Sequence, residues 1–107
     1  MIGLVIAMGS LVFLNGGELK AKCLSRSAAE QGICGGYIIG ASDIFNKLQS
    51  MKVIKTVICL PSNTTQIQVI DATVKYLREN ADTVGSDASA VVPAALIKAF
   101  PCPKTDP

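Results

Sequence analysis

The sequence predicts an all-α domain, a small bundle of four to five helices held together by two disulfide bonds. Apolar residues recur at spacings of three and four along most of the chain, as in helices with one buried face. The four cysteines, Cys23, Cys34, Cys59 and Cys102, stand near expected turns and helix ends. With 107 residues, half of them hydrophobic, the chain can form one modest core, which covalent cross-links would stabilise further.

The first residues predict export. Residues 1–17 carry no charge, and the apolar run within them is typical of the hydrophobic region of a signal peptide. This run is shorter than the roughly 20 residues that a membrane-spanning helix requires. Because no Lys or Arg precedes it, we expect translation to begin upstream of Met1 and the start of the leader to be missing. We therefore predict a signal peptide at residues 1–16 and a single domain at residues 17–107, with a buried first helix as the alternative.

The first two helices are expected on either side of Gly32. Residues 17–30 predict a short amphipathic helix that Gly32 stops, and residues 34–49 predict a second helix. Gly36 and Gly40 lie four residues apart in the second helix, where each costs about 1 kcal/mol relative to alanine. Their pairing predicts that another element approaches the backbone closely. The expected apolar stripe of this helix consists of Tyr37, Ile38, Ala41, Ile44, Phe45 and Leu48.

The third helix has the clearest start signal. Thr65 and Gln68 have the spacing of a capping box, in which each side chain bonds to the backbone N–H of the other residue. An apolar side then continues to about Glu79. Before this helix, residues 51–60 are rich in β-branched side chains, but a single strand would have no partner. We expect them to form an extended connection.

The last helix follows a polar connection at residues 80–85. Ser86 or Asp87 can cap it, and its apolar pattern continues to about Phe100. Pro93 falls within the pattern and removes one hydrogen bond of the helix. The sequence therefore predicts either a kink at Pro93 or a helix that begins close to it.

The residue types argue against catalysis and against nucleic-acid binding. The chain has no histidine to act as a base or to activate a cysteine nucleophile. The cysteines are too far apart to resemble zinc ligands, which usually come in close pairs, and no motif indicates a cofactor. The net charge of +2 comes from ten basic and eight acidic residues that are interspersed along the chain. These observations favour a protein that works by binding another protein.

Four cysteines allow three disulfide pairings, and the spacing alone leaves all three open. Reach favours one of them. A helix over residues 34–49 rises about 22 Å, and the connection that follows can span about 30 Å when extended, so Cys59 can return to Cys34. We therefore expect the pairs Cys34–Cys59 and Cys23–Cys102.

Several short motifs follow one another along residues 19–103: Cys23, Cys34-Gly35-Gly36-Tyr37, Cys59-Leu60-Pro61, Thr65 with Gln68, Val74-Lys75-Tyr76-Leu77, and Ala99-Phe100-Pro101-Cys102. In order and spacing they resemble the Rap/Tai immunity proteins of type VI secretion systems. The resemblance implies a small helical periplasmic protein, often a homodimer, that binds and neutralises a peptidoglycan amidase toxin. From the charge distribution, the motifs and the short leader we also expect no cofactor, no nucleic acid, and no contact with a membrane once the leader is removed.

The resemblance also suggests that a loop between two helices enters the active-site cleft of the toxin. In this chain we expect that loop at residues 79–87, with Glu79, Asn80, Asp82 and Asp87 as partner-binding residues; an ordinary solvated turn is the alternative. A periplasmic acid-stress chaperone and an envelope adaptor protein are alternative functions. Without histidine, an acid switch would depend on the eight carboxylates alone.

Overall fold

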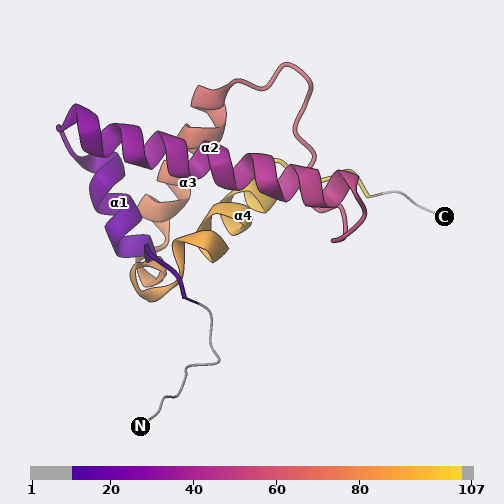
Figure 1. The fold of residues 1–107 in the computed structure, drawn as a ribbon. Coiled ribbons are helices and arrows are strands. Elements are labelled where there is room, and N and C mark those ends of the chain that lie inside the picture. The colour runs from indigo at the N-terminus through magenta and orange to yellow at the C-terminus, as the bar shows by residue number, and fades with distance from the viewer. Residues whose placement is uncertain (1–10, 105–107) are drawn as a thin grey trace, which may run out of the picture.

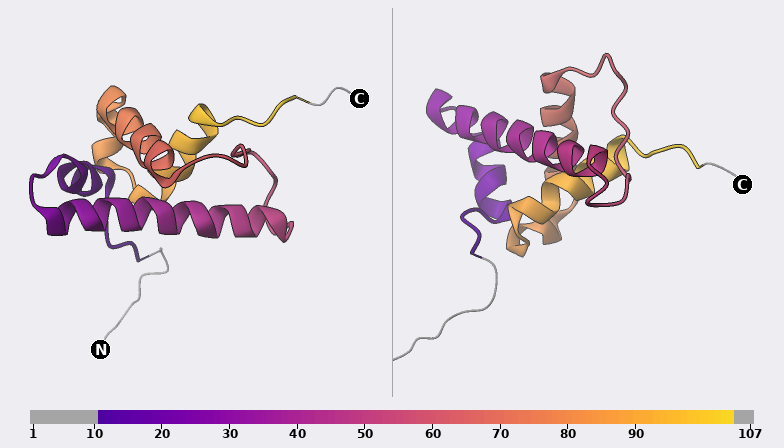
Figure 2. Two further views of the ribbon diagram at one scale, coloured as in Figure 1. Left: turned by 90° about the horizontal axis from the view of Figure 1, so that it is seen from above. Right: turned by 45° about the vertical axis from the view of Figure 1, so that its right-hand side comes forward.

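The structure is a computed structural model that describes residues 11–104. Four α-helices and one 3₁₀-helix follow one another: α1 (Gly16–Leu24), α2 (Ala28–Ser50), α3 (Gln66–Glu79), η1 (Ala81–Gly85) and α4 (Ala88–Ala99). Between residues 11 and 104 there are two isolated β-bridges and no strands. The all-α prediction is thus confirmed. α2 is the longest helix, and α1, α3 and α4 lie on one side of it (Figure 1; Figure 2, left).

The first expected helix is divided in the structure. α1 ends at Leu24, and Ser25 and Ser27 both have extended backbone before α2 begins. The Ser27 hydroxyl accepts a hydrogen bond from the Glu30 N–H and caps α2. Gly32, which was expected to stop the first helix, lies inside α2. That prediction was wrong because serines bond to nearby backbone in non-helical conformations, whereas packing of the later turns offsets one interior glycine.

The core face of α2 agrees in part with the expected stripe, because Ile38 is buried and Tyr37, Ala41 and Phe45 pack against the core. The buried residues of α2 are Cys34, Ile38, Ser42 and Gln49. Ile44, which was assigned to the stripe, is 63% exposed. At 100° per residue, the buried face is rotated about 70° from the predicted one. The predicted close approach at Gly36 and Gly40 was also wrong, because a Cβ at either position would meet nothing within 4 Å.

The core lies where the four helices meet. Its largest fully buried apolar side chains come from all of them: Leu19, Ile38, Leu77, Val92 and Leu96. Thr73 is also fully buried, and its hydroxyl donates to the Val69 carbonyl oxygen at 3.1 Å within α3. This internal bond removes the penalty of burying an unpaired hydroxyl. The small core is therefore continuous, and the buried Thr73 hydroxyl within it has a hydrogen-bond partner.

The helices α3 and α4 agree closely with the sequence. The Thr65 hydroxyl accepts from the Gln68 N–H at 3.2 Å, and the Gln68 side chain accepts from the Thr65 N–H at 2.9 Å, which confirms the capping box. α4 has Asp87 as its N-cap, although the carboxylate makes no capping hydrogen bond. Pro93 lies inside α4, five residues after its start, so the helix does not begin at the proline.

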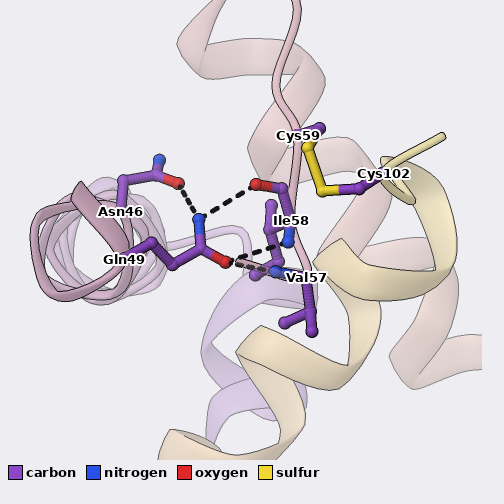
Figure 3. The surroundings of a disulfide bond; sticks show 6 residues. All are labelled: Asn46, Gln49, Val57, Ile58, Cys59 and Cys102. Atoms are coloured by element: carbon purple, nitrogen blue, oxygen red, sulfur yellow. Dashed lines mark hydrogen bonds between the residues drawn. A yellow bond between two sulfur atoms is a disulfide. The ribbon is translucent and has the colours of Figure 1, made fainter. Parts of the chain in front are cut away.

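The connection between α2 and α3 is only partly extended, because residues 51–54 form a turn and the extended backbone begins at residue 55. The side chain of Gln49 fixes the extended part. The Oε1 atom of Gln49 accepts from the N–H groups of Val57 at 2.8 Å and Ile58 at 2.9 Å (Figure 3). Its Nε2 atom donates to the Ile58 carbonyl oxygen at 3.0 Å. Gln49 and Ile58 are both buried, so these bonds satisfy backbone groups that water does not reach. One side chain thus replaces the neighbouring strand that this segment lacks.

Both disulfides differ from the expected pairs. Cys23 bonds to Cys34, with their Cα atoms 5.0 Å apart, and Cys59 bonds to Cys102, with their Cα atoms 4.8 Å apart. The predicted pairs, Cys34–Cys59 and Cys23–Cys102, were wrong because the connection after α2 turns back only as far as Gln49. Cys34 lies about 22 Å further along the helix.

Local contacts explain each observed bond. The short connection between α1 and α2 returns the chain so that Cys23, in the last turns of α1, faces Cys34 in α2. At the other end of α2, the Cys59 N–H donates to the Phe100 carbonyl oxygen at 2.9 Å, and Ile58 forms a bridge with Pro101. This pairing brings Cys59 beside Cys102 (Figure 3).

The folded domain includes residues just before the expected boundary at residue 17. Asn15 and Glu18 form a reciprocal capping box at the start of α1. Leu14 packs against the core, and its carbonyl oxygen accepts from the Ala88 N–H at 3.0 Å. Residues 1–10 of the expected leader lie outside the described residues. Among residues 11–104, no helix combines the length and apolar character needed to span a bilayer.

Candidate functional site

The connection between α3 and α4, expected to bind the partner, is a rigid turn. Asn80 ends α3, and its side-chain amide donates to the Tyr76 carbonyl oxygen at 2.9 Å. The next residues form η1, in which the N–H of Thr83 donates to the Asn80 carbonyl oxygen at 3.0 Å. The Thr83 hydroxyl donates to the same oxygen, and Thr83 is buried. These bonds give residues 79–87 a defined shape.

The start of α1 fixes this connection from the other side. The Gly16 N–H donates to the Ser86 carbonyl oxygen at 2.7 Å, and Asn15 forms a β-bridge with Asp87. A Cβ atom at Gly16 would overlap the carbonyl group of Thr83. Gly16, and not Gly36 or Gly40, is thus the glycine that permits a close backbone approach. This role of Gly16 was not predicted, because residue 16 was assigned to the leader.

The four residues expected to bind the partner do not form one cluster. Glu79, Asp82 and Asp87 are exposed, and Asn80 is half-buried by its structural role. Glu79 lines a cavity between α3 and α4, whereas Asp87 lies near the Tyr37 side chain of α2. Around this rigid turn, three separate carboxylates therefore point to solvent.

The cavity between α3 and α4 has a volume of about 510 Å³ and was not expected from the sequence. Tyr76 and Phe100 form its apolar part, and charged side chains of both signs surround them: Asp71, Lys75, Glu79 and Lys98. The charges on α3 recur every four residues, so the sequence contained a signal for a charged face beside this cavity. The cavity continues the exposed surface of residues 79–87 through Glu79.

A second cavity, of about 480 Å³, lies between α2 and the first turns of α4. Gly36 and Gly40 form part of its wall, because they carry no side chain into it, and Ile44 is exposed beside it. Burial raises the pKa of the Tyr37 hydroxyl, and the charge of Asp87 raises this pKa further. A side-chain hydrogen bond with Ser89 acts in the opposite direction.

Neither a metal-binding group nor a free thiol is found in the part of the chain that the structure describes. Within residues 11–104, no group of three or more His, Cys, Asp or Glu side chains could hold a metal ion. All four cysteines are in disulfides, so none is available as a nucleophile. What the structure offers is a set of rigid surfaces, which suits recognition of another macromolecule.

The fold and its exposed turn together define a disulfide-braced helical binding protein. Residues 15–102 match the family of Rap1a immunity proteins, and the chain belongs to this family. It is therefore an immunity protein directed against a secreted effector, and membership of this family favours an inhibitor over an enzyme. The comparisons found no similar curated protein and no similar solved structure. The match begins at Asn15, the cap of α1, in agreement with the start of the folded domain.

Proposed function

We propose that this chain is a periplasmic immunity protein that inhibits a peptidoglycan amidase delivered by a type VI secretion system. In this proposal, residues 79–87 enter the amidase cleft and occlude its active site. The observation that carries the proposal is the fixation of this exposed turn by Thr83 on one side and Gly16 on the other. A turn that is already ordered loses little conformational entropy on binding, so more of the contact energy contributes to affinity.

The charges of the turn support this assignment. Asp82 and Asp87 are exposed, and the Asp87 carboxylate makes no capping hydrogen bond within the chain. Both carboxylates can therefore pair with basic or N–H groups of an enzyme without breaking a bond of the fold. Asn80 acts through the shape of the turn, because its amide is bonded to Tyr76.

Export to the periplasm is part of the proposal. Two disulfides and no free cysteine within residues 11–104 agree with an oxidising compartment. The leader is expected to be removed before Leu14, because cleavage after residue 16 would delete the Asn15 cap and the bond from Ala88 to Leu14. Sequencing the N-terminus of the protein purified from the periplasm measures this boundary.

Co-expression tests the proposed function. The chain is expressed behind a signal peptide that directs it to the periplasm, together with a periplasmic peptidoglycan amidase effector, and lysis and complex formation are measured. We expect the exported chain to prevent lysis and to co-purify with the amidase. A version retained in the cytoplasm is the control, and it should not protect. Lysis that continues despite abundant exported protein, for every amidase effector tried, would contradict the proposal.

The homodimer that the resemblance implies stays a prediction. Sedimentation of the purified protein, alone and with its amidase, measures it. This experiment also separates immunity from chaperone activity, because an immunity complex has a fixed stoichiometry, whereas a chaperone binds unrelated unfolded clients without one.

A further inference from the structure

The turn that follows α2 combines positive charge with exposed apolar side chains. From residue 44 to residue 70 the chain contains no Asp or Glu, and its only charged side chains are Lys47, Lys52 and Lys55. Met51 and Val53 alternate with these lysines and are 59% and 62% exposed. We call residues 47–55 the basic tip. It lies at the end of α2 that is distant from α1 (Figure 2, left), and Met51, Lys52 and Val53 are exposed there.

The backbone of the basic tip has an uncommon residue at its centre. The Lys52 N–H donates to the Gln49 carbonyl oxygen at 3.0 Å, and the Val53 N–H donates to the Leu48 carbonyl oxygen at 3.0 Å. These two bonds form a Schellman motif, in which the residue in the left-handed conformation is usually glycine. Here it is Lys52, with φ of 60°, the only residue other than glycine with positive φ within residues 11–104. A lysine thus occupies a position where the fold alone would favour glycine.

We propose that the basic tip binds the surface of a bilayer that contains anionic phospholipid. Lys47, Lys52 and Lys55 would lie against the headgroups, and Met51 and Val53 would enter the interface beside them. No acidic side chain within the basic tip offsets its positive charge. The nearest acidic residue along α2, Asp43, lines a separate cavity together with Thr64. Lys104 lies in the C-terminal segment that leaves the fold at this same end (Figure 1).

Shape favours a lipid surface over an acidic protein. The basic tip is a convex turn, and four cavities found within residues 11–104 do not include Met51, Lys52 or Val53. A flat, fluid surface can accept a convex tip and its two exposed apolar side chains without a shaped pocket. The proposal differs from the expectation that the mature chain contacts no membrane. That expectation was based on the leader and did not take the surface of the folded domain into account. The proposal is independent of the proposed effector, since residues 79–87 lie near the opposite end of α2.

Vesicle binding tests the proposal. The purified chain is mixed with vesicles of phosphatidylcholine alone, or of phosphatidylcholine and phosphatidylglycerol in equal parts, and binding is measured by co-sedimentation. Each lysine near an anionic surface contributes about fivefold, so we expect binding to the anionic vesicles to be about a hundredfold stronger. High salt should abolish the difference. An uncharged leader that was retained would bind both vesicles alike, so it does not mimic this result.

Variants assign the binding to the basic tip. Lys52→Gly should lower binding about fivefold while leaving the melting temperature unchanged or higher, because glycine fits the left-handed position. Lys47→Ser combined with Lys55→Ser should lower it about 25-fold. Arg26→Ser, at the other end of α2, removes the same charge and should bind like the parent chain. Equal binding by all variants, equal binding to both vesicle types, or capture of the tip by polyglutamate but not by vesicles would overturn the proposal.

Discussion

Gln49 holds Ile58 by both backbone polar groups of that residue, accepting from its N–H at 2.9 Å and donating to its carbonyl oxygen at 3.0 Å (Figure 3). A neighbouring β-strand would make the same two bonds. In this fold the Gln49 side chain, from the last turns of α2, makes both bonds. It also accepts a third hydrogen bond, from the Val57 N–H. Gln49 therefore helps to position Cys59 and its disulfide, together with the hydrogen bond from the Cys59 N–H to the Phe100 carbonyl oxygen.

Replacing Gln49 should therefore destabilise the whole domain. Gln49→Leu keeps the size of the side chain but leaves three backbone groups without partners, two of them on buried Ile58. We expect the free energy of unfolding to fall by about 3 kcal/mol, measured by urea denaturation. Gln66→Leu, at an exposed position of α3, is the matched control and should change it by less than about 0.5 kcal/mol. Equal effects of both substitutions would contradict the role of Gln49.

Gly16 and Gly36 should respond to alanine in opposite directions. Gly16→Ala would force the new methyl group against the Thr83 carbonyl, so we expect a loss of about 2 kcal/mol or more in the free energy of unfolding. Gly36→Ala meets open space within α2 and should stabilise the protein by about 1 kcal/mol. Thermal unfolding of both variants checks this, and destabilisation by Gly36→Ala would show that its surface is covered.

The two disulfides should contribute unequally to stability. Cys59 and Cys102 are 43 residues apart, whereas Cys23 and Cys34 are 11 apart, so the first bond restricts the unfolded chain more. Chain entropy predicts about 4 kcal/mol for Cys59–Cys102 and about 3 kcal/mol for Cys23–Cys34. Paired Cys→Ser variants and urea denaturation measure both. Peptide mapping without reduction should recover a fragment that joins Cys23 to Cys34, and a Cys34–Cys59 fragment would refute the observed pairing.

Charge reversal in the turn should weaken effector binding without unfolding the protein. Asp82→Lys and Asp87→Lys alter exposed carboxylates that make no hydrogen bond within the described fold. We expect affinity for the amidase to fall about tenfold, mainly through slower association. Glu30→Lys, an exposed acidic residue in the first turn of α2, is the control. Unchanged affinity in both turn variants would remove residues 79–87 from the interface.

Tyr37 should make the domain sensitive to alkaline pH. Burial raises the pKa of its hydroxyl above the ordinary value of 10.0, and Asp87 raises it further. The folded state therefore holds this proton more tightly than the unfolded state does. The contribution is complete below the ordinary pKa and is lost as the pH rises through the raised one. Urea midpoints of Tyr37→Phe should decline less steeply over this alkaline range, and parallel declines would contradict the shift.

Local signals predicted the helices well, and long-range pairings poorly. The capping box of Thr65 and Gln68 located the start of α3 because both partners are three residues apart. Asn15 and Glu18 have the same spacing, but the apolar leader concealed that signal. The cysteine pairs depend on how far the chain turns back after α2. The buried contact between Gln49 and Ile58 determines that distance. No pattern in the sequence distinguishes Gln49 from an exposed glutamine.

For the candidate site too, the local features were predicted and the long-range contacts were not. Residues 79–87 were located correctly as the polar connection between two helices, because helix ends are encoded nearby. What holds them could not be predicted, since Gly16 and Ser86 are 70 positions apart in the chain. Likewise, the cavity beside Gly36 depends on which face of α2 is buried, and Ser42 and Gln49 place polar residues on that face. Hydrophobic periodicity alone places the buried face about 70° away from its observed position.

The bonds that join Gly16 to Ser86 and Leu14 to Ala88 connect the earliest folded residues to the turn before α4 and to the first residue of α4. A chain that crosses a membrane from its N-terminus delivers these two segments at different times. If the protein is exported and residues 79–87 bind the effector, as proposed, this turn acquires its final geometry only after Ala88 has crossed the membrane. Newly made copies would gain protective capacity late, so the cell's defence would depend on protein that was secreted before the attack.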